Sequence, residues 1–160
     1  MPRPSRLAAA ALLSAWGLIA AAEAPAQPAA PDIPDAVVAR MLRLGLENIH
    51  RAVCDGFNPC KPATPQELEF PPITMDQARA AVVTGTRSAV ARWCGLDADR
   101  RSLMPMTRHL RQKLGFSGRQ VALVVIIHGI QQGIVAEQLK ARGACDAATR
   151  SQVDAQLPKS

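Results

Sequence analysis

Aromatic residues are scarce in this chain, and tyrosine is absent. Among its 160 residues there are three phenylalanines and two tryptophans. Proteins that bind sugars or single-stranded nucleic acid stack their ligands on aromatic side chains, so we expect neither ligand. The motifs of nucleophilic catalysis are also missing, because no elbow motif surrounds a serine and no glycine-rich phosphate loop follows a strand. We therefore expect no catalytic residues and no cofactor.

Acidic residues are absent from a long internal stretch, between Asp99 and Glu137. A basic surface in a chain of formal net charge +6 favours acidic partners. We expect a binding module that docks on an acidic envelope protein or an anionic surface, although a solvated face of a basic protein is the simpler alternative. The oligomeric state stays open. The expected surface consists of Arg100, Arg101, Arg108, Arg111, Lys113 and Arg119.

A C-x-x-C motif is lacking, and the spacing of the four cysteines matches no common zinc site. We expect no metal site and two structural disulfides instead. Cys94 and Cys145 would end neighbouring helices at the same end of a bundle, while Cys54 and Cys60 would close a small loop, so these two pairs are preferred. The pairing Cys54–Cys94 with Cys60–Cys145 is left open.

The N-terminal segment has the pattern of a secretory signal peptide. Arg3 and Arg6 precede the apolar run Leu7–Ala22, and small residues follow. This predicts a signal peptide over residues 1–22, with Ala26 as a second cleavage position. The run is short for the ~30 Å hydrocarbon core of a bilayer, so an uncleaved anchor is the less favoured alternative. We expect a periplasmic or secreted protein whose mature chain has no transmembrane span.

Proline and the hydrophobic pattern divide the remaining chain. Proline at every third residue from Pro25 to Pro34 predicts an extended linker over residues 23–34. Apolar residues at three- and four-residue steps over residues 35–157, with no strand-like alternation, predict one all-α domain. We expect a small bundle of four main helices plus a short C-terminal helix. The second proline-rich stretch, residues 59–72, should contain no helix.

Capping signals predict where the helices begin. Thr74 with Gln77 and Ser117 with Gln120 are capping boxes, and Pro105 should kink or split the third helix. The helices are expected over residues 35–53, 74–93, 97–114, 118–142 and 146–157.

The predicted helix 118–142 is apolar on every side, so it should be the buried centre of the bundle. Gly129 and Gly133 form a G-x-x-x-G step, and small residues recur at matching spacing in helix 74–93. Small residues let two helix backbones approach closely. We expect these two helices to touch along the two small-residue stripes.

Two polar residues, His128 and Gln132, interrupt this apolar helix one turn apart. Buried polar groups need hydrogen-bond partners, which they find in a ligand or within the core. An alternative function is therefore a small-ligand-binding protein or enzyme with a core pocket at this pair. A chaperone-like role in envelope stress is a further alternative. Glu47 and His50 have the spacing of a di-iron ligand pair, but the sequence contains no second pair.

Overall fold

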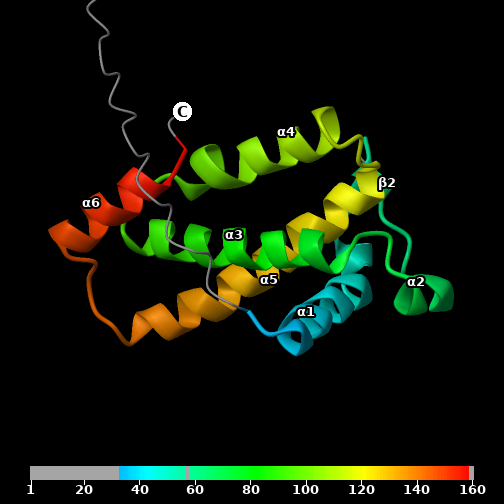
Figure 1. Cartoon of the computed structure of the whole chain (residues 1–160), viewed down its shortest axis with the longest axis horizontal. Helices are drawn as coiled ribbons and strands as arrows, with labels where there is room; N and C mark the ends of the chain where they lie inside the picture. The colour runs from blue at the N-terminus through cyan, green and yellow to red at the C-terminus, as the bar shows by residue number, and fades with distance from the viewer. Residues whose placement is uncertain (1–32, 57, 159–160) are drawn as a thin grey trace, which may run out of the picture.

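The computed structural model describes residues 33–56 and 58–158 of the chain (Figure 1). The predicted signal peptide and nearly all of the predicted linker lie outside these residues. The all-α prediction is confirmed, since the described β-structure is a single two-stranded hairpin. The elements are α1 (Asp35–Glu47), η1 (Ile49–Arg51), β1 (Val53–Asp55), β2 (Asn58–Pro59), α2 (Pro65–Glu69), α3 (Met75–Trp93), η2 (Asp99–Leu103), α4 (Met104–Gln112), α5 (Gly118–Lys140) and α6 (Ala147–Gln156).

Helix α1 is shorter than predicted, because it ends at Glu47 rather than at residue 53. The Asn48 side chain donates to the carbonyl oxygen of Leu44 at 2.9 Å, and a 3-10 turn follows. The chain then pairs Val53 with Pro59 in the hairpin that the Cys54–Cys60 disulfide closes. The 3-10 turn and the first strand of the hairpin therefore replace the last part of the predicted helix.

Helix α2 corrects the prediction that residues 59–72 contain no helix. Pro65 is the first helical residue, where its missing N–H leaves no hydrogen bond unmade. Thr64 and Glu67 form a reciprocal capping box, with the Thr64 amide donating to the Glu67 carboxylate at 2.9 Å. A proline that would break a helix interior therefore starts a short helix here.

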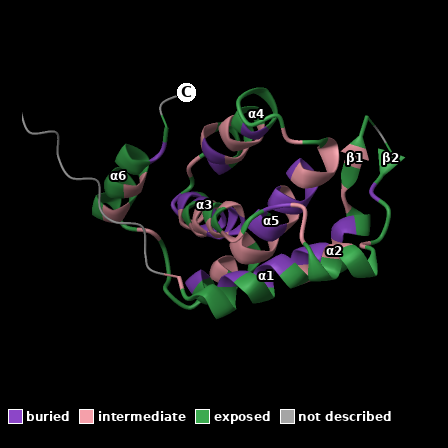
Figure 2. Ribbon diagram, turned by 45° about the vertical axis from the view of Figure 1, so that its right-hand side comes forward, coloured by how far each residue is buried: buried purple, intermediate pink, exposed green. Residues whose placement is uncertain are grey.

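Helices α3 and α5 form the centre of the fold and run in the same direction (Figure 1). Helix α4, which connects them in the sequence, runs back along one side of this pair. Both predicted capping boxes are present: the amide of Thr74 donates to Gln77 Oε1 at 2.8 Å, and that of Ser117 to Gln120 Oε1 at 3.0 Å. Helix α1 packs against both. The buried side chains lie where these three helices face one another (Figure 2).

The predicted contact between α3 and α5 exists, but the predicted stripe on α5 is wrong. A Cβ at Gly85 of α3 would lie 2.5 Å from the carbonyl oxygen of His128, so glycine permits the close approach. Gly129 and Gly133 are exposed, and no atom of the described chain lies within 4 Å of a Cβ placed at either. The small-residue stripe of α5 therefore makes no packing contact with α3.

The third predicted helix is split as its proline suggested. A π-helical segment, η2, precedes α4, and Pro105 lies in the first turn of α4. Asp97 Oδ1 accepts from the amide of Arg100 at 3.0 Å. Helix α6 begins after its predicted cap, Asp146, whose carboxylate accepts from the amide of Thr149 at 2.7 Å.

Helix α5 is the central helix, but only its first half is buried on all sides. Val121, Leu123 and Ile127 are at most 3% exposed, whereas Ile134 in the second half is 42% exposed. By length and composition α5 is the one helix in the described chain long and apolar enough to cross a membrane, a test that a core helix also passes. A third of its most apolar window is buried by the rest of the fold. The prediction of burial over residues 118–142 is therefore too broad.

The preferred disulfide pairing is confirmed, because Cys54 bonds Cys60 and Cys94 bonds Cys145. All four cysteines of the chain are used. The second bond joins the end of α3 to the loop after α5, as parallel helices that end at one side allow. Disulfides persist in oxidising compartments, so the pairing indicates a location outside the reducing cytoplasm.

Candidate functional site

Two of the six residues of the predicted basic surface, Arg101 and Arg119, are engaged in ion pairs within the fold. Arg101 turns toward the C-terminal end of the described chain and forms an ion pair with Asp154. Its Nε donates to the carbonyl oxygen of Pro158 at 3.1 Å, and its Nη2 to that of Asp154 at 2.9 Å. The side chain is 18% exposed. Arg101 therefore fastens α6 to η2.

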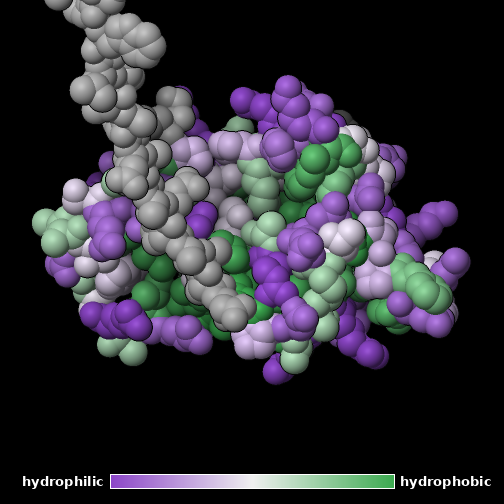
Figure 3. Space-filling view, in the orientation of Figure 1, coloured by the Kyte–Doolittle hydropathy of each residue, from purple (hydrophilic) through white to green (hydrophobic). Residues whose placement is uncertain are grey.

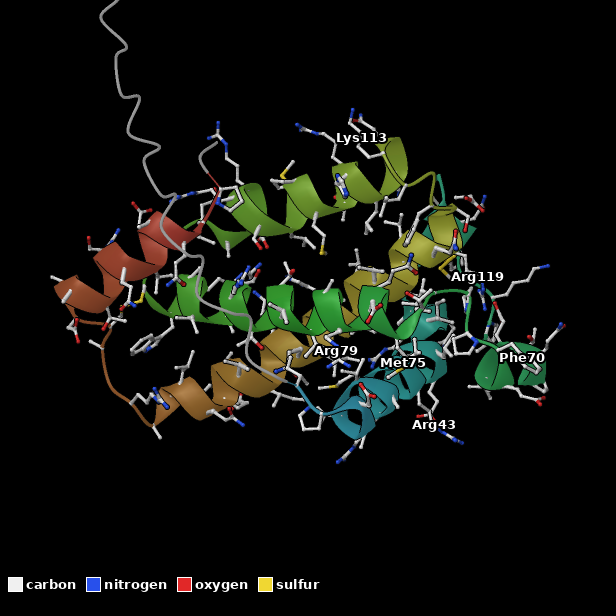
Figure 4. The ribbon with its side chains drawn as sticks, viewed as in Figure 1. Arg43, Phe70, Met75, Arg79, Lys113 and Arg119 are labelled. Carbon is white, nitrogen blue, oxygen red and sulfur yellow. A yellow bond between two sulfur atoms is a disulfide. The ribbon has the colours of Figure 1, made fainter. Side chains whose placement is uncertain are left out.

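Arg119 has a similar structural role at the other end of the molecule (Figure 4). Its Nε and Nη2 donate to the two carboxylate oxygens of Glu67 at 2.6 and 2.8 Å, and its Nη1 donates to the carbonyl oxygen of Lys61 at 2.8 Å. These hydrogen bonds lower the pKa of Glu67 to about 2 and raise the pKa of Arg119. A bidentate pair of this kind fixes geometry, so Arg119 holds α2 against α5.

The other four predicted cations, Arg100, Arg108, Arg111 and Lys113, are exposed and form no ion pair within the described chain. We call Arg108, Arg111 and Lys113, together with Arg100, the α4 basic face. Helix α4 buries Leu110 and half-buries Pro105, Met106 and Thr107, while its other residues are exposed. Hydrophilic side chains gather along the edge that α4 forms (Figure 3), and Lys113 points away from the fold (Figure 4).

His128, half of the predicted core pocket, lies in a closed polar cluster. Its Nε2 is 2.9 Å from Ser88 Oγ, and Ser88 Oγ donates to Ser102 Oγ at 3.1 Å. Burial lowers the pKa of His128, the nearby charge of Asp99 opposes this shift, and that of Arg92 adds to it. The imidazole is therefore neutral at pH 7.

The Ser88–His128 distance is that of a nucleophile and its general base. Both residues are 1% exposed, however, and Ser102 is 8% exposed. A substrate has no access to either atom. The cluster instead joins α3, η2 and α5 through side chains that satisfy one another, which the sequence could not show because Ser88 is 40 residues from His128.

Gln132, the other half of the predicted pocket, does not share a cavity with His128. It lines a groove of about 490 Å³ that also contains Trp93, Gly129, Gly133 and Ala136. Its Nε2 is buried and has no hydrogen-bond partner in the described chain. We call this cavity the α3–α5 groove. Sequence reasoning placed Gln132 at a pocket, but it took Gly129 and Gly133, which form the floor of this groove, as packing residues.

The rim of the α3–α5 groove carries polar groups at the C-terminal ends of both helices. Trp93 Nε1 donates to the carbonyl oxygen of Gly143 at 2.8 Å, which fixes the indole as one wall. Arg92 and Lys140 also line the groove. Arg92 is paired with Asp99, and Lys140 Nζ lies 2.6 Å from Glu137 Oε1; all four side chains are about half exposed or more.

Potential metal ligands are dispersed in the described chain. No group of three or more histidine, cysteine, aspartate or glutamate side chains comes together within it. Glu47 is paired with Arg43 at 3.2 Å, and His50 follows the end of α1 in a 3-10 turn. The two therefore do not share a helix face.

Comparison with known proteins gives no indication of function, so function is inferred from the geometry of the structure. No family model, curated protein or solved structure matches this chain. The two candidate sites are thus the α4 basic face and the α3–α5 groove.

Proposed function

We propose that this protein is a non-catalytic binding module of the periplasm, and that the α4 basic face docks on an acidic surface of a partner protein. The observation that carries the proposal is the concentration of exposed cations between Arg100 and Lys113, along η2 and α4, in a stretch without an acid. Such a face raises the encounter rate with an acidic partner and orients it. Export through a signal peptide over residues 1–22, consistent with the two disulfides, is part of the proposal.

A protein partner suits α4 better than a membrane surface does. Interfacial helices insert an apolar face into the lipid while their cations meet the headgroups. The apolar side of α4 is directed into the fold, where Leu110 is 7% exposed. Met104, 55% exposed, precedes Arg108 and Arg111 by four and seven residues and so shares their side of the helix. An apolar contact ringed by cations fits an acidic protein surface.

The test compares capture from envelope extract by the purified, oxidised protein and by the variant Arg108→Gln/Arg111→Gln/Lys113→Gln. We expect the wild type to capture an acidic protein at low salt and to lose it at high salt, because exposed charge pairs are screened. The captured protein, once purified, should bind the variant about tenfold more weakly or worse, since each exposed pair contributes up to ~1 kcal/mol.

The matched control is Arg40→Gln/Arg51→Gln/Arg142→Gln, which removes the same charge from exposed residues outside α4. Equal loss of binding in both variants would show that net charge alone is sensed, and would refute the proposed face. Phosphatidylglycerol vesicles provide the second control. Binding to these vesicles, without capture of a protein, would assign the face to a membrane and also refute the proposal.

A further inference from the structure

We propose that the α3–α5 groove is a binding site for a small carboxylate with an apolar body, such as a medium-chain fatty acid. The site is separate from the α4 basic face, because none of Arg100, Arg108, Arg111 or Lys113 lines it. Its volume of about 490 Å³ lies within the range of ligand pockets, most of which are apolar with a few polar groups.

The floor of the groove is shaped by glycines that no packing contact within the described chain requires. Two other helical glycines, Gly45 and Gly85, each face a neighbour that a Cβ would approach to 2.7 or 2.5 Å. Gly129 and Gly133 face only open space. Glycine is a poor helix former, so two exposed glycines four residues apart need another reason. A molecule lying along the helix backbone supplies one.

Gln132 provides an independent indication of a ligand. Its Nε2 is the one buried side-chain nitrogen or oxygen without a partner in the described chain. A buried N–H group that makes no hydrogen bond is unfavourable, and an acceptor oxygen at this position would satisfy it. Gln132 lines the groove, so a rotation of its side chain would bring this donor to an acceptor oxygen of a molecule bound there.

The charges at the groove favour an anion. Arg92 and Lys140 line it, and no aspartate or glutamate does. Their ion-pair partners, Asp99 and Glu137, are exposed, so those pairs are weak and exchange readily with a ligand carboxylate. An acceptor that is also an anion therefore satisfies Gln132 and complements both cations.

The rest of the lining favours an apolar body. Ala89, Ala136 and Leu139 contribute aliphatic surface, and the Trp93 ring forms a wall. Hydrophobic surface is exposed between the C-terminal ends of α3 and α5 (Figure 3). The carboxylate would lie near Gln132 and the cations, with the alkyl chain along Gly129 and Gly133.

Trp93 reports binding directly. In a protein carrying Trp16→Phe, all tryptophan emission comes from Trp93, since the chain has two tryptophans. Decanoate, titrated below its micelle concentration, should change this emission saturably. Decanol and decylammonium, which keep the chain but lack the negative charge, should bind at least tenfold more weakly.

Variants separate the groove from unspecific binding. Gly133→Leu should abolish the decanoate response, because its side chain fills the floor, whereas Gly133→Ala should keep it. Ala80→Leu, at an exposed position of α3, is the matched control and should bind like the wild type. Gln132→Leu should weaken decanoate at least tenfold and leave decanol unchanged. Thermal unfolding of each variant shows that the fold is retained.

Three results would overturn the proposal. The first is the absence of a saturable Trp93 response, and the second is a response that Gly133→Leu leaves unchanged. The third concerns a second copy of the chain. If sedimentation shows a dimer that Gly133→Leu dissociates, the glycine stripe is a dimer interface and not a ligand site.

Discussion

The two halves of α5 differ both in composition and in their surroundings. From Val121 to His128 most residues are buried among α1, α3 and α4. From Gly129 to Lys140 only Leu139 is buried, and Ile134 is exposed. The composition of α5 follows this difference: residues 121–128 are apolar except for His128, whereas residues 129–140 include three glutamines, a glutamate and a lysine. The neighbouring helices cover the apolar half and leave the mixed half at the surface.

The largest expected effect on the free energy of unfolding comes from truncating one aliphatic side chain to alanine in each half of α5. Leu123→Ala removes a side chain that is fully buried, and should lower the free energy of unfolding by ~2–5 kcal/mol. Ile134→Ala, at a position 42% exposed, should lower it by less than about 1 kcal/mol. Urea denaturation followed by circular dichroism measures both. Equal losses would mean that a second chain covers the second half in solution.

Adding a methyl group at Gly118 and at Gly133 tests the same comparison between the two halves of α5. A Cβ at Gly118 would collide with the carbonyl oxygen of Cys54, which the disulfide loop holds in place. Gly118→Ala should therefore destabilise the protein by about 1–3 kcal/mol. Gly133→Ala meets no atom and should stabilise it by up to about 1 kcal/mol through helix propensity. Thermal unfolding would contradict this contrast if both changes had the same sign.

The smallest effect concerns His128, the last buried residue of the first half. Its folded pKa is lowered from 6.5, so the unfolded chain binds the proton more tightly. Protonation of the unfolded chain at this residue does not reduce the free energy of unfolding above pH 6.5. As the pH falls from 6.5 toward the folded pKa, the free energy of unfolding decreases by up to about 1.4 kcal/mol per pH unit. His128→Asn should remove this dependence between pH 7 and 5.

The control for this prediction is His109→Asn, at an exposed position of α4. Free energies of unfolding measured at several pH values should give the wild-type slope for this control. Glu67 contributes little between pH 7 and 5, because the stability it adds is lost only as the pH falls below its unfolded pKa of 4.5 toward its folded pKa of about 2. An unchanged slope in His128→Asn would assign the acid sensitivity to other groups.

Local signals in the sequence predicted much of the fold. The capping boxes at Thr74 and Ser117, and the glycines after α3, α4 and α5, act through neighbouring residues alone. Gly95, Gly115 and Gly143 all have positive φ, as expected of helix stops. The disulfide pairing followed from the directions of the helices, which short connections constrain.

The functional surfaces were predicted less well, because they depend on distant partners. Arg101 is held by residues more than 50 positions away, as is Arg119. Nothing beside either residue in the sequence distinguishes it from the exposed Arg108. The separation of His128 from Gln132 has the same origin, since Ser88 of α3 satisfies one and leaves the other at the groove.

The two disulfides differ in their relation to the hydrophobic core. Cys54–Cys60 closes the hairpin against the start of α5, and Cys94–Cys145 ties down the loop before α6. The first bond belongs to the core, because Cys60 is buried there and Cys54 packs against it, whereas Cys94 and Cys145 lie outside that cluster. A copy of the chain that lacks the second bond would keep its core contacts, so a protease should cut it first in the loop before α6.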